Sequence, residues 1–311
     1  MKQRLFSTIL VALLFSGIVN AQNMDIPVLY KTIQVSGLNI FYREAGTPGK
    51  PVLLLLHGFP SSSKMFEKLF PLLSDRYHLI APDYPGFGYS DAPPPSRFAY
   101  TFDHIADIVD SFIKALNLTS YSMYVQDYGG PVGFRLITKH NAKPTSLIIQ
   151  NAVSHEAGLG PLWETRRAFW KDRAAHEEQL KKNFTSLEAT RQRHVGTNPH
   201  PERIDPDGWM DEYAFLTRPV QAAIQTDLFY DYQTNLASYP VWQQWLKANQ
   251  PRLLVLWGKY DPSFMVAGAE AYKKTSPPPA SSSWTPDTSH STRSRLRSAT
   301  RSAPSFLQTT K

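Results

Sequence analysis

A carboxylate stands where an apolar run, residues 121–125, gives way to a helix-like segment, residues 132–140. It belongs to Asp127, and Gly129 and Gly130 follow it. In a nucleophile elbow, a sharp turn between a strand and a helix exposes one reactive side chain. Small residues are needed next to it because the turn crowds the backbone. A carboxylate held in this way can attack an electrophilic carbon and become an alkyl ester. The alternative is an ordinary strand-to-helix loop in which Asp127 is the N-cap of the helix.

The composition limits the other chemistry that the chain can carry. Most of the net charge of +7 lies at the two ends, because residues 1–21 contribute +2 and residues 275–311 contribute +4. Charge placed there is poor evidence for a nucleic-acid groove, so we expect a small-molecule substrate and no nucleic-acid partner. The chain has no cysteine, which excludes disulfides, thiol nucleophiles and cysteine–metal sites. No motif implies a metal or another cofactor.

The first 21 residues have the pattern of a secretory signal peptide. Lys2 and Arg4 precede a mostly apolar stretch at 5–19, and Ala21 ends a cleavage site of small residues. The apolar stretch is too short and too interrupted for a permanent membrane span. We therefore expect an exported protein, periplasmic or secreted, with no stable span after cleavage. The alternative is an N-terminal anchor that is left uncleaved.

Strands and helices alternate over most of the chain, which predicts a parallel sheet covered by helices on both faces. Residues 153–240 differ, since they have helical spacing and no buried-strand run. After Lys274 the pattern ends, and Ser, Thr, Pro and Arg predominate, as in disordered segments. The expected elements are strands at 29–35, 39–44, 51–56, 78–82, 121–125, 146–150 and 252–257, and helices at 64–74, 103–117, 132–140 and 266–274.

Four motifs, each after an expected strand, carry a resemblance to a known family. They are His57-Gly58-Phe59-Pro60, the loop 83–91, Gln126-Asp127-Tyr128-Gly129-Gly130, and Trp257-Gly258-Lys259-Tyr260-Asp261. Together they resemble the α/β-hydrolase superfamily over residues 28–274, within the branch of epoxide hydrolases and haloalkane dehalogenases that uses an aspartate nucleophile. The resemblance implies an α/β fold with a mostly parallel central sheet. It divides the chain into a signal peptide at 1–21, a core at 22–152 and 241–274, a helical lid at 153–240 and an aberrant tail at 275–311.

The resemblance also assigns roles to individual residues. Asp127 is implied to be the nucleophile, and the backbone N–H groups of Phe59 and Tyr128 are implied to hold the oxyanion that forms when water attacks the ester. Asp261 is implied to be the acid that orients a catalytic histidine, although Asp261 is also explained as a turn residue. His57 resembles a structural histidine of the family, so we do not expect it to be the base.

The choice between an epoxide and a halide stays open at this point. Tyr232 is the best match to a lid tyrosine with which epoxide hydrolases protonate the opening ring, although the family usually has Arg where Gln233 stands. The alternative for Tyr232 is simple packing. Both enzyme groups commonly have Trp where Tyr128 stands, and epoxide hydrolases have His where Gln126 stands. The chain therefore departs from both patterns.

The catalytic histidine is the missing part of the pattern. Only His290 follows Asp261 among the nine histidines, whereas the family has a last apolar strand, then Asp-x-Gly-His, then a helix. Residues 281–291 offer neither strand nor helix. Read one nucleotide earlier, their codons permit an apolar strand followed by Leu-Asp-Thr-Gly-His-Phe. We therefore hypothesise a frameshift near Lys274 to Thr275, with loss of the last strand and helix; the alternative is a divergent but genuine tail.

Two functions from different classes remain. The first is a hydrolase of epoxide or carbon–halogen bonds in small apolar molecules, which acts through an ester on Asp127 and is crippled if His290 is no working base. The second is a catalytically inactive protein of the same fold, either a degenerate product or a binding module.

Overall fold

A seven-stranded sheet forms the centre of the molecule, which the computed structural model describes over residues 26–276. The strand order is β1-β2-β4-β3-β5-β6-β7. The pairs β1–β2 and β2–β4 are antiparallel, and the other neighbours are parallel. The strands are β1 (Leu29–Val35), β2 (Leu38–Ala45), β3 (Val52–Leu56), β4 (His78–Pro82), β5 (Tyr121–Gln126), β6 (Leu147–Gln150) and β7 (Leu253–Leu256).

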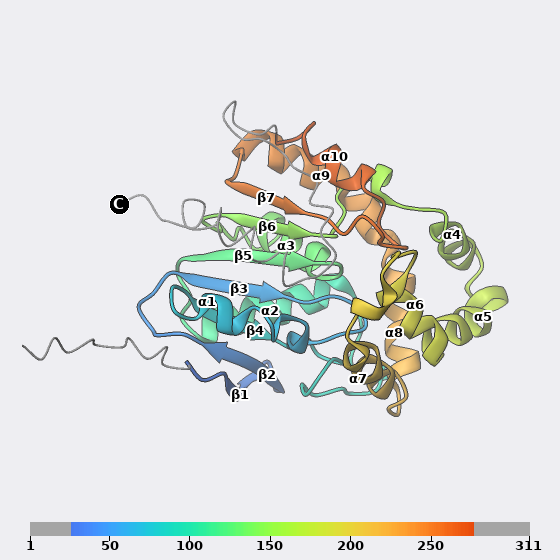
Figure 1. Ribbon diagram of the computed structural model, residues 1–311, viewed down its shortest axis with the longest axis horizontal. Helices are drawn as coiled ribbons and strands as arrows, with labels where there is room; N and C mark the ends of the chain where they lie inside the picture. The colour runs from blue at the N-terminus through green and yellow to red at the C-terminus, as the bar shows by residue number, and fades with distance from the viewer. Residues whose placement is uncertain (1–25, 277–311) are drawn as a thin grey trace, which may run out of the picture.

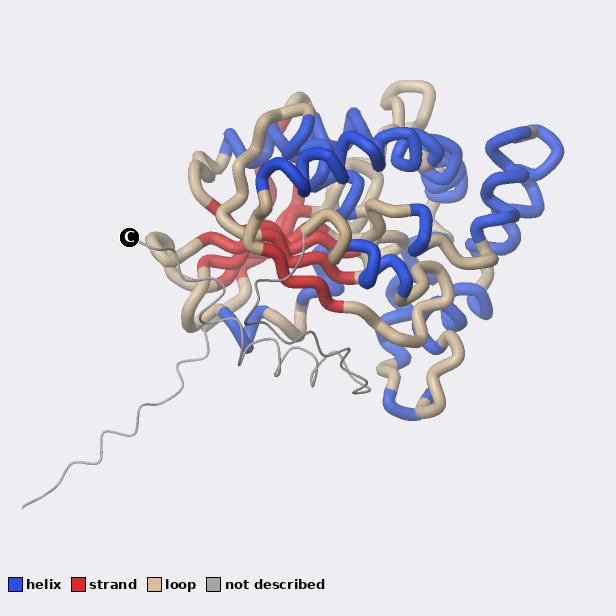
Figure 2. Tube along the Cα trace, turned by 90° about the horizontal axis from the view of Figure 1, so that it is seen from above, coloured by secondary structure: helices blue, strands red, loops and turns tan. Residues whose placement is uncertain are grey.

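Helices cover the sheet and extend beyond the ends of its strands (Figure 1, Figure 2). The core helices are α1 (Phe70–Leu73), α2 (Phe102–Ala115), α3 (Gly129–Thr138) and α10 (Ala267–Tyr272), with the short 3-10 helix η1 (Ser63–Phe66). The segment between β6 and β7 is helical; it contains η2 (Glu156–Gly158), α4 (Trp163–Lys171), α5 (Arg173–Thr185), α6 (Leu187–Val195), η3 (Pro201–Arg203), α7 (Pro206–Leu216), α8 (Gln221–Asp231) and α9 (Gln233–Asn249). Helices α4 to α8 lie together on the right of Figure 1, beyond the strands.

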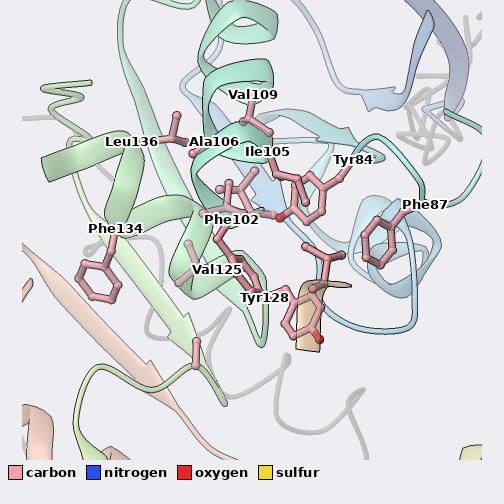
Figure 3. Close-up of a cluster of buried hydrophobic side chains, with 14 of the residues drawn as sticks. Tyr84, Phe87, Phe102, Ile105, Ala106, Val109, Val125, Tyr128, Phe134 and Leu136 are labelled. Atoms are coloured by element: carbon pink, nitrogen blue, oxygen red, sulfur yellow. The ribbon is translucent and has the colours of Figure 1, made fainter. Parts of the chain in front are cut away.

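Helix α2 shows how the sequence places one helix against the sheet. The hydroxyl of Thr101 accepts a hydrogen bond from the backbone N–H of His104 and caps the first turn. Ile105, Val109 and Phe112 recur at helical spacing and are buried. Figure 3 shows α2 side chains in one apolar cluster with residues that follow β5. The cluster fixes α2 and α3 against one face of the sheet, directly behind the elbow.

The other face of the sheet is covered differently from the sequence-based expectation. We expected one helix over 64–74, but the chain forms η1 and then the single turn α1. Pro71 stands at the start of α1, where its missing N–H costs nothing, and a helix running through this position would lose a hydrogen bond. Phe66 and Phe70 still pack on this face of the sheet. The face is therefore covered as expected, although two short helices replace the single predicted one.

Strand β7 is the last strand of the sheet within residues 26–276, and it is incompletely covered there. All four of its residues are half-buried, whereas four of the five residues of β3 are fully buried. Leu254 and Leu256 belong to the same face as Phe66 and Phe70.

Several expectations fall on residues outside the described part of the chain. These are the signal peptide at 1–21, the tail from residue 277 onward, the absence of a last strand and helix, and His290. Between residues 26 and 276, no helix is both long and apolar enough to cross a bilayer.

Candidate active site

The turn after β5 lifts Asp127 out of the sheet. Asp127 has φ = +49°, a left-handed conformation that is uncommon for a residue with a side chain and that marks a strained turn. The strand ends at Gln126 and α3 begins at Gly129, so the turn takes only two residues. A Cβ atom on Gly129 would lie 2.1 Å from the carbonyl oxygen of Leu56. Glycine is therefore required for this tight passage from strand to helix.

Two backbone amides converge on one carboxylate oxygen of Asp127. The N–H groups of Phe59 and Tyr128 donate hydrogen bonds of 2.8 and 2.6 Å to Oδ1. Oδ2 accepts no hydrogen bond from residues 26–276. The loop after β3 reaches the turn because Gly58 has no side chain, since a Cβ there would lie 2.3 Å from the Cβ of Asp127. The geometry thus holds one oxygen and leaves the other available.

The pKa of the Asp127 carboxyl is raised to about 7. Burial is the main cause, since it removes water from the charged form. The charge of Asp261 raises the pKa further, whereas the two amide hydrogen bonds and the charge of Arg166 lower it. Near neutral pH a large share of the side chain is ionised and poorly solvated, and both features suit a nucleophile.

Asp261 lies in the loop after β7, close enough for its charge to act on Asp127. Its Oδ1 accepts hydrogen bonds from the backbone N–H groups of Ser263 (2.7 Å) and Phe264 (2.9 Å). Its Oδ2 accepts one from the side-chain amide of Asn151. Burial is the main cause of a raised pKa at Asp261. The Asp261 carboxylate is held by three hydrogen bonds and its charge acts on Asp127, which fits the expected acid and also a structural turn.

Two buried phenols lie near the carboxylate. The rings of Tyr128 and Tyr232 are 5.9 Å apart, and Tyr128 also packs edge-on against Phe102 of α2 at 4.9 Å (Figure 3). Burial and the negative charge of Asp127 place the pKa of both hydroxyls well above the ordinary value. The Tyr128 hydroxyl is buried without a hydrogen-bond partner in the described part of the chain. Both groups therefore stay protonated and can donate a proton or a hydrogen bond.

His57 is a structural residue, as expected. Its Nε2 accepts a hydrogen bond from the backbone N–H of Tyr84 (3.2 Å), so Nδ1 carries the proton and donates it to the carbonyl of Gly58 (3.1 Å). The ring stacks on Tyr84 at 4.0 Å. Burial lowers the pKa of His57 to about 3, which keeps it neutral. Because both nitrogens are engaged, His57 has no free lone pair for a base.

No histidine within residues 26–276 hydrogen-bonds to Asp127 or Asp261. His155 is buried with an unpartnered Nε2, but the charges that act on it are those of Lys274 and Lys247. His290 lies outside the described residues, so its place relative to Asp261 stays a prediction. Over residues 26–276 there is also no cluster of His, Asp or Glu that could bind a metal ion.

Three polar residues of this region were not predicted from the sequence. Asn151 follows β6 directly, as Asp127 follows β5, and this position could have indicated it. Besides contacting Asp261, its Oδ1 accepts a hydrogen bond from the N–H of Gly258 (2.9 Å). The others are Arg166 on α4 and Arg193 on α6, whose charges act on Asp127. Nothing in the sequence distinguishes them from the other lid arginines.

Comparison with known proteins agrees with this geometry. The family described as the alpha/beta hydrolase fold matches residues 51–291, more than half of the chain. The chain belongs to the alpha/beta hydrolase family. The expected fold class is thereby confirmed. A hydrolase of Saccharomyces cerevisiae, described as uncharacterized, is 39% identical over 251 residues, which cover 79% of this chain and 86% of the yeast protein.

Several relatives of this hydrolase are haloalkane dehalogenases. The enzyme of Psychrobacter cryohalolentis is 38% identical over 130 residues, which cover 40% of this chain and 43% of that enzyme. Among solved structures, a haloalkane dehalogenase of Bradyrhizobium elkani has a TM-score of 0.64 at 22% identity, covering 80% of this chain and 87% of that one. One from Agrobacterium tumefaciens has a TM-score of 0.63 at 22% identity, covering 80% and 85%. At such identity the structural likeness establishes the fold alone.

Proposed function

We propose that this hydrolase opens an epoxide or displaces a halide from a small apolar molecule through an alkyl ester on Asp127. One observation carries the proposal: the N–H groups of Phe59 and Tyr128 both hold Oδ1 of Asp127, while Oδ2 is left without a hydrogen bond within residues 26–276. Oδ2 attacks the electrophilic carbon, and the carbon–oxygen or carbon–halogen bond breaks as the new ester bond forms.

The same two amides serve the second step. Water attacks the ester carbonyl carbon, and the negative charge develops on Oδ1, which the N–H groups of Phe59 and Tyr128 already contact. Collapse of this intermediate releases the alcohol and regenerates the Asp127 carboxylate. The step requires a base to take a proton from water. Asp261 would orient that base, and His290 is the in-order candidate.

The two phenols favour an epoxide over a halide. An opening epoxide leaves an alkoxide that must be protonated, and Tyr232 and Tyr128 are protonated donors beside Asp127. A departing halide needs no proton. The relatives that are haloalkane dehalogenases support the halide as the second candidate.

We further propose that the coding sequence carries a frameshift near Lys274 to Thr275. The half-buried residues of β7 support it, because a further strand and helix would cover this edge of the sheet. Sequencing the gene across codons 270–295 tests it. If no single-base insertion or deletion restores the Asp-x-Gly-His motif, the frameshift proposal is wrong. The apolar stretch at 5–19 likewise supports a proposal of export, which detection of a mature chain beginning at Gln22 would test.

Peptide mapping by mass spectrometry after incubation with an epoxide or an alkyl bromide tests the ester itself. We expect a mass increase on the peptide that contains Asp127, and none in Asp127→Asn. Slow release of the adduct in this chain, with multiple turnover only in a frame-corrected chain, would establish the missing base. If no adduct forms on Asp127 in either chain, the protein is a non-catalytic member of the family.

A further inference from the structure

Two cationic side chains of the lid lie close enough to Asp127 for their charges to interact with it. Arg166 stands on α4 and Arg193 on α6, and the charge of Asp127 acts on the pKa of both. Burial lowers the pKa of each guanidinium, to about 10 for Arg193. Arginine side chains keep their charge in proteins at neutral pH. They also act on one another as like charges.

Their surroundings place both guanidinium groups on one aromatic cluster. Arg166 lies 4.6 Å from the ring centre of Trp163 and 5.4 Å from that of Phe229. Arg193 lies 5.2 Å from the ring centre of Phe59. The rings of Phe59 and Phe229 are themselves in contact, with centres 4.9 Å apart. Because the amide of Phe59 binds Oδ1 of Asp127, this aromatic cluster connects both cations to the carboxylate.

Both side chains keep hydrogen-bonding capacity that residues 26–276 do not use. The Nε of Arg166 and the Nε of Arg193 are buried, and neither has an acceptor. The other nitrogens reach only neutral oxygens: the carbonyls of Leu162 and Phe184 at 3.3 Å and the hydroxyl of Thr190 at 2.8 Å. No carboxylate in this part of the chain lies at ion-pair distance from either guanidinium. A guanidinium that is desolvated and has no carboxylate at ion-pair distance can bind an anionic group of a ligand, which would supply the missing acceptor.

Neighbouring arginines on the same helices behave differently. Arg167 on α4 pairs with Glu156 at 3.1 Å, and Arg191 on α6 pairs with Glu188 at 3.6 Å. These two arginines thus have a glutamate at ion-pair distance, whereas Arg166 and Arg193 have none within residues 26–276. Glu212 is the carboxylate whose charge acts most strongly on Arg193, but it forms no ion pair with it. This contrast separates Arg166 and Arg193 from the general basic character of the lid.

We propose that Arg166 and Arg193 bind a carboxylate group of the substrate, so that the preferred electrophile is a small epoxide or halide that bears one carboxylate on an otherwise apolar molecule. This inference rests on the proposed reaction at Asp127 and names its substrate class. The planar fork of a guanidinium matches a carboxylate and gives strong charge-assisted hydrogen bonds. Together with the carboxylates of Asp127 and Asp261, a dianion such as a phosphate would place four negative charges against two guanidinium groups, whereas a carboxylate would place three. The aromatic cluster would cover the apolar part of the molecule between the carboxylate and the reacting carbon.

Matched pairs of compounds, with and without the charge, test this site in the full-length chain. Glycidate and glycidamide are epoxides of nearly equal shape, and the rate of Asp127 ester formation is compared between them. Butyrate and butyramide carry no electrophile, so their affinities, measured by calorimetry, report binding without chemistry. The variants are Arg166→Gln and Arg193→Gln, with Arg167→Gln and Arg191→Gln as controls on the same helices. Arg166→Lys keeps the charge without the fork, and thermal unfolding identifies any variant that does not fold.

We expect the unaltered chain to prefer butyrate over butyramide and glycidate over glycidamide by at least about tenfold. Each of Arg166→Gln and Arg193→Gln should reduce that preference by about 10- to 100-fold, and the controls should leave it unchanged. Arg166→Lys should retain part of the preference. Equal losses for charged and neutral compounds would mean that the arginines only offset the charges of Asp127 and Asp261, and would overturn the proposal.

The two kinds of measurement separate this inference from the proposed reaction. If butyrate binds selectively through the arginines but no ester forms on Asp127, the carboxylate site stands and the proposed reaction fails. If esters form equally fast with glycidate and glycidamide, the reaction stands and the carboxylate site fails. If bromide ion competes with butyrate for the same site at equal affinity, the arginines hold a departing halide and the carboxylate assignment is wrong.

Discussion

The backbone N–H of Phe59 and the carboxylate of Asp127, 68 residues apart in the sequence, form a hydrogen bond of 2.8 Å. The bond joins the loop after β3 to the turn after β5, two neighbouring parallel strands. Parallel strands end at the same edge of a sheet, so the two loops meet there. Because the N–H of Tyr128 also binds Oδ1, the pair fixes which oxygen is held and which is free to react.

A methyl group on Gly58 should separate this pair. In Gly58→Ala the new Cβ would lie 2.3 Å from the Cβ of Asp127, so the nucleophile must move. We expect ester formation to fall by at least about a hundredfold, the scale of a 1 Å misplacement. Gly133→Ala is the control, because its Cβ would meet Val125 at 2.7 Å and not Asp127. Both variants should lose about 1–3 kcal/mol in the free energy of unfolding. Equal rates of ester formation in the two variants would show that the methyl group on residue 58 does not displace Asp127.

The raised pKa of Asp127 should appear in the pH dependence of stability. Between the ordinary value of 3.8 and about 7, the native state holds a proton that the unfolded state has lost. The free energy of unfolding therefore falls as pH rises through this window and is level above it. Asp127→Asn lacks the titration, so its stability relative to the unaltered chain should rise from pH 4 to pH 8, by at most about 4 kcal/mol. Denaturant unfolding of both chains at several pH values measures this change. A difference in the free energy of unfolding that is the same at every pH would contradict the raised pKa.

The rate of ester formation should also depend on the ionisation of Asp127, but it should increase with pH, whereas the free energy of unfolding decreases. Only the carboxylate attacks, so the rate with an alkyl bromide should increase about tenfold per pH unit below 7 and level off above. Arg166 lowers the pKa of Asp127, hence Arg166→Gln should move the midpoint to higher pH. Arg167 pairs with Glu156, so Arg167→Gln should leave the midpoint of the pH profile unchanged. An unchanged midpoint in Arg166→Gln would show that the two charges do not interact.

Elements with strong local sequence patterns could be predicted, whereas residues whose role depends on three-dimensional contacts could not. The tight turn that presents Asp127 was predictable, since a buried strand, a carboxylate and two glycines adjoin in sequence. The break between η1 and α1 was missed, although Pro71 was a visible reason for it. The buried arginines could not be found, because a charged residue at helical spacing has the same sequence pattern whether it faces solvent or Asp127. Only the packing of α4 and α6 over Phe59 and Phe229 distinguishes them.

The hydroxyl of Tyr232 should distinguish an epoxide from a halide as the substrate. Protonation of the epoxide oxygen contributes about 10²- to 10⁴-fold to ring opening, whereas a halide leaves without a proton. Tyr232→Phe should therefore slow ester formation with an epoxide by about that factor, and change the rate with an alkyl bromide less than about threefold.

The control for Tyr232, which caps the C-terminal end of α8, is Tyr230→Phe in the last turn of that helix. The ring of Tyr230 packs against Phe169 at 5.6 Å and against the guanidinium of Arg173 at 5.2 Å, so its hydroxyl is not needed for ring opening. Peptide mapping of the Asp127 ester at timed intervals gives both rates for each variant. Equal slowing of the epoxide and the bromide by Tyr232→Phe would indicate a displaced nucleophile. No slowing of either would assign the proton to Tyr128, whose buried hydroxyl has no hydrogen-bond partner in the described chain.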